Sequence, residues 1–149
     1  MRLGSGLGPL RIGARRVVFG ERFRTERHRE NDSGGCSGSP ILDSFVDYYD
    51  GRRLGYVFSF GGKTFLDTIA TTRIGDRTAV GFAVGRAMLQ QVRRRYPDVT
   101  VLHEHARYFL GATQLRIEVA TGEESWKAVT YSFDRAGRLI ELETAVGGC

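Results

Sequence analysis

Residues 113–146, TQLRIEVATGEESWKAVTYSFDRAGRLIELETAV, decide the fold class that the sequence predicts. Apolar and polar residues alternate in the first part of this stretch, which is the pattern of a strand with one buried face. The motifs TGEE and DRAG are typical of short turns, and they delimit two further strands expected over 126–133 and 138–146. Three sequential strands joined by short turns form an antiparallel meander.

The sequence upstream of this stretch predicts three more strands, over 41–49, 53–60 and 64–71. The first is rich in apolar and aromatic residues, aromatic residues alternate along the second, and Asp50-Gly51 between them is a strong signal for a hairpin turn. The predicted sheet therefore draws strands from both the middle and the end of the chain.

Helical periodicity is confined to two segments. In 85–96 the apolar residues recur at helical spacing and form one stripe, and Pro97 ends the segment. A weaker helix is expected over 14–29, where charged residues dominate. The sequence thus predicts an α+β fold in a single domain, 1–149, with an antiparallel sheet packed on one or two short helices.

Composition limits the class of protein. The chain has 149 residues and a formal net charge of +5, and residues 1–30 alone carry an excess of five positive charges. No apolar stretch is long enough to span a bilayer.

The two cysteines, Cys36 and Cys149, do not form the spacing pattern of a disulfide-rich protein. They could be two unpaired thiols, or they could form a single disulfide bond. The start lacks the apolar region of a signal peptide, and we expect a cytoplasmic protein or a secreted one whose leader is absent.

Two short motifs indicate an internal repeat. GPLRIG at 8–13 aligns with VGFAVG at 80–85, and a charged segment follows each. The order of a Gly-flanked apolar turn, a helix, a loop and a meander resembles the tandem repeat of the beta-lactamase inhibitory protein family. It also resembles the single-copy envelope lipoproteins of the outer-membrane assembly type. The resemblance implies two degenerate repeat units, 6–75 and 78–147, and a role in binding another protein.

The stretch GCSGSPI at 35–41 resembles the nucleophile loop of trypsin-like serine proteases, in which Ser37 would be the nucleophile. Its activating His should lie upstream, where His28 is the one His available. The alternative interpretation is a Gly/Ser loop without catalysis. A small hydrolase stays an alternative function, and the carboxylates that a pocket could bring together are Asp47, Asp50 and Glu118.

Two further patterns point to ligands. His103 and His105 would share one face of a strand and could share a metal ion, but a third ligand is not evident. The alternative is an exposed polar strand end, and we expect no metal or other cofactor.

Three consecutive arginines at 93–95 could bind phosphates, or they could be a solvated helix end. Because no aromatic stacking pattern accompanies them, a nucleic-acid partner is not expected, although a basic nucleic-acid-associated protein stays an alternative.

Aromatic side chains on the expected strands give the main functional prediction. The candidate partner-binding residues are Tyr48, Tyr49, Tyr56, Trp126 and Tyr131. An antiparallel sheet often leaves one face exposed, where Tyr and Trp anchor interfaces; the alternative is that these rings belong to the core. No nucleophile, base and orienting group can be assembled from three His and two isolated Cys. We therefore expect a non-enzymatic protein–protein binding module whose partner and oligomeric state the sequence leaves open.

Overall fold

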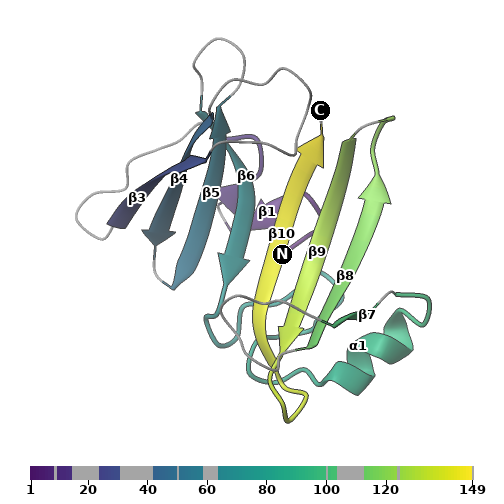
Figure 1. Ribbon diagram of the computed structural model, residues 1–149. Coiled ribbons are helices and arrows are strands. Elements are labelled where there is room, and N and C mark those ends of the chain that lie inside the picture. Colours follow the sequence, from purple (N-terminus) through teal and green to yellow (C-terminus); the bar gives the residue numbers. More distant parts are fainter. Residues whose placement is uncertain are drawn as a thin grey trace.

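The computed structural model describes residues 1–8, 10–14, 24–30, 42–49, 51–58, 64–99, 101–103, 113–123 and 125–148. At 24–30, 42–49, 56–58, 64, 101–103 and 148 it describes the backbone alone. In chain order the elements (Figure 1) are β1 (Gly6–Leu7), β2 (Leu10–Arg11), β3 (Arg24–Glu30), β4 (Leu42–Tyr49), β5 (Arg52–Phe58), β6 (Thr64–Thr71), α1 (Leu89–Arg95), β7 (Val101–His103), β8 (Thr113–Ala120), β9 (Ser125–Phe133) and β10 (Leu139–Gly148).

Eight strands form one antiparallel sheet in the order β3-β4-β5-β6-β10-β9-β8-β7, while β1 and β2 form a separate small hairpin. The first four strands of the sheet are one meander, and the last four are another. The two meanders meet where β6 pairs with β10, a contact that we call the seam. The seam consists of four residue pairs, between 68–71 and 142–145.

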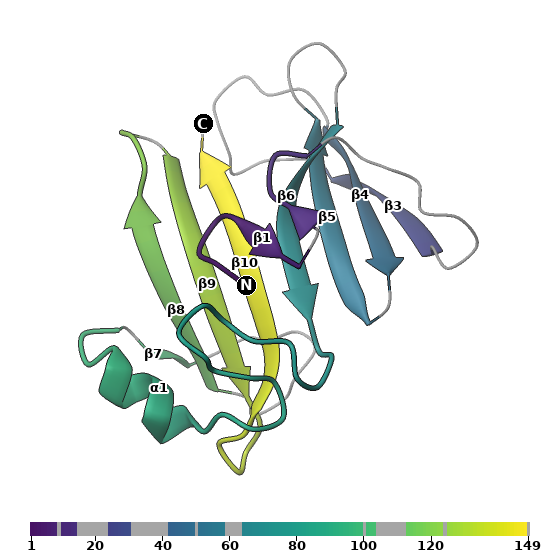
Figure 2. The same cartoon turned by 180° about the vertical axis from the view of Figure 1, so that it is seen from behind.

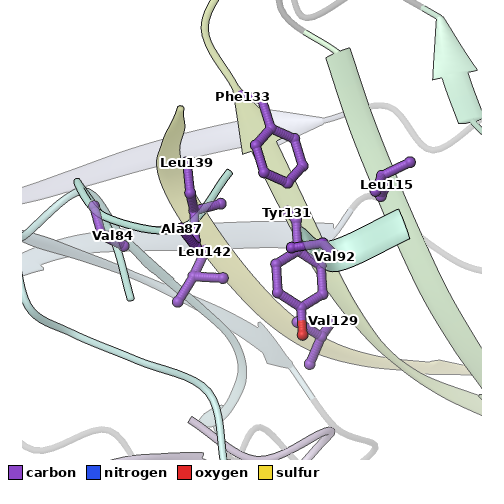
Figure 3. Close-up of a cluster of buried hydrophobic side chains, with 9 residues drawn as sticks. All are labelled: Val84, Ala87, Val92, Leu115, Val129, Tyr131, Phe133, Leu139 and Leu142. Atoms are coloured by element: carbon purple, nitrogen blue, oxygen red, sulfur yellow. The ribbon is translucent and has the colours of Figure 1, made fainter. Parts of the chain in front are cut away.

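The main hydrophobic core lies on one face of the sheet, which we call the covered face. Alternation along β9 places Val129, Tyr131 and Phe133 on this face, and the strand register sets Leu115 and Leu142 beside Tyr131. Segment 72–99 covers them and contributes the buried residues Val84, Ala87 and Val92 (Figure 3). This apolar contact, rather than backbone hydrogen bonding to the sheet alone, holds the segment in place.

A second, smaller core lies under the N-terminal hairpin, on the same face of the first meander (Figure 2). Its buried members are Leu7, Leu10, Leu54, Leu66 and Ile69. The hairpin is also tied to the sheet by backbone hydrogen bonds between Leu66 and residues 13 and 14. Both meanders are therefore covered on one face, and Figure 1 looks onto the opposite face.

The strands predicted from alternation are confirmed to within two residues at either end, but the α+β class is wrong. The fold is mostly β, with one short helix in the described part of the chain. That helix was expected over 85–96. The N–H of Gly85 donates to the Leu139 carbonyl, and the N–H of Leu139 donates to the Ala87 carbonyl. These bonds to β10 hold the segment before the helix in non-helical geometry, so α1 begins late.

The helix predicted over 14–29 is wrong in its second half, where the chain forms β3. Seven residue pairs join β3 to β4. A ladder of that length outweighs the modest helix propensity of a charged segment. Residues 15–23 lie outside the described part of the chain.

Each predicted repeat unit, 6–75 and 78–147, contains one of the two meanders. The aligned motifs themselves differ locally, since 8–13 belongs to the N-terminal hairpin and 80–85 to turns beside α1. The duplication and the resemblance that it suggested stay predictions. None of the helices that the structure describes has the length and hydropathy that crossing a bilayer requires.

Candidate functional site

The face of the sheet opposite the core, which we call the open face, carries polar and small side chains. The register places every second residue of β8, β9 and β10 there. From these strands the open face has Gln114, Arg116, Glu118, Ala120, Trp126, Ala128, Thr130, Ser132, Glu141, Glu143, Ala145 and Gly147. Across the seam, Ala70 pairs with Glu143 and Thr68 with Ala145, which adds β6 to the same face.

Small residues form the floor of the open face along the seam. Ala70 and Ala128 are each 1% exposed, and Ala145 is 7% exposed. Longer side chains from neighbouring strands therefore lie over them. Arg53 of β5 pairs in the ladder with Ala70, and its Nη2 reaches Oε2 of Glu143 at 3.0 Å, so this ion pair crosses β6.

Two further carboxylates, Asp67 and Glu141, lie close enough to this ion pair for its charges to affect their pKa values. Asp67 sits at an irregularity of β6, where the pairing shifts opposite Gly55 and Tyr56. A Cβ on Gly55 would lie 3.3 Å from Asp67 Oδ1, so glycine leaves room for that carboxyl. Burial raises the pKa of Asp67, and Glu143 raises it further. Burial also raises the pKa of Glu141, which Arg53 lowers in part.

Asp67 and Glu141 take part in no ion pair within the described residues. The two guanidinium groups of the open face that the structure describes are already engaged, Arg53 with Glu143 and Arg116 with Glu118. The open face thus holds two half-buried carboxylates that form no ion pair with a described residue, and Arg53 offsets the burial of Glu141 only in part. A positively charged ligand is the chemistry that this arrangement favours.

Trp126 lies at the other end of the open face. A Cβ on Gly147 would lie only 2.3 Å from Cζ2 of its indole, so the ring packs directly against the backbone of β10. The guanidinium carbon of Arg116 stacks 4.4 Å from the ring centroid, and Nε of Arg116 bonds Oε2 of Glu118 at 2.9 Å. The indole is thereby held in one orientation by neighbours on two strands.

The predicted binding residues do not share one surface. Trp126 is half-buried on the open face, and its role in binding stays a prediction. Tyr131 is 2% exposed and belongs to the core, which corrects its assignment as a partner-binding residue. Its ring meets Phe82 edge-on, with centroids 6.1 Å apart. Tyr131 also lines an apolar cavity of about 150 Å³ on the covered face, and its burial raises the pKa of the phenol.

The other three tyrosines lie on strands whose side chains fall outside the description at those positions. Tyr48 and Tyr49 end β4, and Tyr56 lies within β5. In the ladder Tyr48 pairs with Arg53, the strand neighbour that reaches Glu143. Their role in binding stays a prediction.

The structure describes few of the residues of the protease-like, carboxylate and metal sites that the sequence suggested. Ser37, Cys36, Asp50, His105 and Cys149 lie outside the described residues, as do the side chains of His28, Asp47 and His103. Glu118 is paired with Arg116, and both line a shallow pocket that also contains Asp98. Among the residues whose side chains are described, no three His, Cys, Asp or Glu are grouped so that they could hold a metal ion.

Sequence reasoning missed the carboxylates. A signal was present in the ELET motif at 141–144, where Glu141 and Glu143 alternate with Leu142 and must share the face opposite the core. The bulge that places Asp67 beside them has no comparable signal. Arg53 is also out of reach of sequence analysis, because its partner Glu143 lies 90 residues away.

The raised pKa values of Asp67 and Glu141 predict how stability depends on pH. The folded protein keeps these protons to a higher pH than the unfolded chain does, so the two groups favour folding in acid. Their contribution is lost as pH rises above the ordinary carboxyl range. We expect Asp67→Asn combined with Glu141→Gln to raise the melting temperature at about pH 7, with a smaller gain at about pH 4. Thermal denaturation at both pH values measures this; an equal gain at both would contradict it.

Comparison of the chain with protein-family models, with curated proteins and with solved structures found no match.

Proposed function

We propose that this protein is a non-enzymatic binding module that takes a basic segment of another protein on its open face. The observation that carries this proposal is the pair of half-buried carboxylates, Asp67 and Glu141, neither of which forms an ion pair with a described residue. Carboxylates in this position are desolvated without an ion pair, and a Lys or Arg from outside supplies the opposite charge. The chain as a whole is basic, with a net charge of +5, so an acidic face also orients such a partner toward this side.

The open face has the length for an extended peptide. Glu141, Glu143 and Gly147 follow one another on the same side of β10, and the six-residue separation of the first and last corresponds to about 20 Å. Trp126 covers Gly147 at the far end. A segment of about six extended residues would place a cation near the carboxylates at one end and an apolar side chain near the indole at the other.

The single tryptophan of the chain makes the proposal directly testable, because Trp126 reports on the open face alone. We expect peptides that alternate Arg or Lys with apolar residues to change its fluorescence in a saturable way. Asp67→Asn with Glu141→Gln should weaken this binding, since their negative charges are gone. In a parallel anisotropy measurement with labelled peptide, Trp126→Ala should weaken binding about 30-fold, as is typical of an interface anchor.

Val119→Ala is the matched control, because Val119 is 44% exposed on β8 but lies on the opposite face from Trp126. It should bind the basic peptides as the natural chain does. Peptides with Glu in place of Arg or Lys should leave the fluorescence unchanged. Equal responses to acidic and basic peptides, or no response to either, would refute a binding site for basic segments here.

A further inference from the structure

The outer surface of segment 72–99 is distinct from the open face and faces the other way (Figure 2). The segment crosses the covered side of the sheet and is folded by its own backbone contacts, such as the bridge between Arg77 and Ala83. Val84 and Val92 fix it to the core at 1% and 0% exposure. Thr78 and Ala87 are also buried, and Phe82, Leu89, Tyr96 and Val99 pack partly buried against the core. The exposed side chains of the segment are therefore presented on a firmly anchored layer.

Exposed apolar side chains concentrate on this segment. Among the described residues four large apolar side chains are exposed, and three of them lie here: Ile74 at 77%, Val80 at 47% and Met88 at 38%. Ile74 and Val80 occupy turns, and Met88 is the N-cap of α1. Ile74 also lies against Gly85, where a Cβ would be 3.3 Å from its Cγ2, so separate turns of the segment meet at this residue.

The same segment carries an excess of cations. It contains six arginines against two aspartates, and Asp76 is already engaged by Arg52, whose Nε and Nη2 each lie 3.0 Å from one of its carboxylate oxygens. The exposed arginines that form no ion pair with any described residue are Arg77, Arg86, Arg93, Arg94 and Arg95. The helix dipole accounts for cations in the last turn of α1, but it does not account for Arg77 and Arg86, which precede the helix.

Exposed apolar side chains and arginines on one segment favour one kind of polyanionic ligand over the others. Nucleic acid would offer phosphates to the arginines but no apolar environment to Ile74 and Val80. An acidic protein surface would call for a contiguous apolar centre with aromatic anchors, whereas the exposed side chains here are aliphatic and come from two turns and a helix N-cap. The surface of an anionic bilayer meets both requirements, since headgroups bind arginine and the acyl boundary accepts protruding apolar side chains.

We propose that segment 72–99 docks this protein onto membranes that contain anionic phospholipids, with Ile74, Val80 and Met88 at the acyl boundary. The arginines of the segment contact the headgroups. Each arginine near such a surface strengthens partitioning about fivefold at low ionic strength, and salt weakens the effect. The open face points away from the bilayer in this orientation and stays available to a protein partner.

Vesicle co-sedimentation tests the proposal. The full chain should bind vesicles of equal parts phosphatidylcholine and phosphatidylglycerol, bind phosphatidylcholine alone far more weakly, and dissociate as salt is added. Arg93→Gln with Arg94→Gln should weaken binding about 25-fold, and Lys at both positions should restore most of it. Because both side chains are exposed, these variants are expected to fold normally.

Matched substitutions test separately how much the apolar side chains contribute to vesicle binding. Ile74→Ser should weaken vesicle binding several-fold, whereas Ile74→Leu should preserve it. Val119→Ser removes an exposed apolar side chain outside the segment and should leave vesicle binding unchanged. Equal binding to neutral and anionic vesicles, no effect of the glutamine pair, or retention on DNA without vesicle binding would each overturn the proposal. The basic-peptide assay on the open face is independent of all these outcomes.

Discussion

Replacement of Phe133 with alanine is expected to lower the free energy of unfolding by about 3–5 kcal/mol. Phe133 is fully buried at the end of β9, where it pairs in the ladder with Thr113 and Leu139. It also belongs to the cluster that joins the sheet to Val84 and Val92 of the covering segment. Truncation would leave a cavity between the two layers, which at that end are otherwise joined by backbone hydrogen bonds of Gly85 and Ala87 with Leu139.

Domains of this size are stable by about 5–15 kcal/mol, so the Phe133→Ala variant should lose a large part of its stability. Chemical denaturation followed by far-UV circular dichroism measures the change. Val119→Ala is the control on a neighbouring strand, and because its side chain is 44% exposed it should change stability by about 0.5 kcal/mol or less. A loss below about 1 kcal/mol for Phe133→Ala would show that the core is not packed as described.

Replacement of Gly6 with alanine is expected to destabilise the protein by about 3 kcal/mol through loss of the N-terminal hairpin. Gly6 adopts φ +143°, and a Cβ there would lie 2.0 Å from the carbonyl oxygen of Leu10. No side-chain movement relieves a clash with backbone, so β1 and β2 must separate. Leu7 and Leu10, at 6% and 7% exposure, would then leave the second core.

Gly8→Ala provides the comparison within the same hairpin. Gly8 has φ +55°, but a Cβ there meets nothing within 4 Å, so the substitution adds only the strain of a left-handed residue, about 1 kcal/mol. Hydrogen exchange of the Leu66 amide, which donates to the Ala14 carbonyl beside the hairpin, should quicken in Gly6→Ala and not in Gly8→Ala. Equal stability of the two variants would show that the clash is not what fixes this position.

The sequence predicted those elements that are determined by residues close together in the chain, and it missed those that are determined by tertiary contacts. β8, β9 and β10 were predictable because alternation and turn residues act over a few positions. β3 was not, because its ladder with β4 is a tertiary contact that overrides a charged segment's local preference. The start of α1 was missed for the same reason, since bonds from Leu139 fix residues before the helix.

The residues of the candidate site also divide into those that a local pattern places and those that only tertiary contacts bring together. Trp126 and Tyr131 are five residues apart on one strand, so simple alternation already places them on opposite faces, and only one of them could belong to an exposed surface. That inference needed no structure. The meeting of Arg53 with Glu143 needed the pairing of two meanders across the seam, which no local pattern specifies.

The seam has a mechanical consequence. Each meander closes its own backbone hydrogen bonds. The two halves are joined by four residue pairs, by the Arg53–Glu143 ion pair and by the N-terminal segment, which bonds to Leu66 on one side and to Thr144 on the other. Separation along this line would expose two unpaired strand edges, β6 and β10, and such edges pair readily with those of a second molecule. Intertwined dimers that exchange halves are therefore the form in which this chain is expected to self-associate at high concentration.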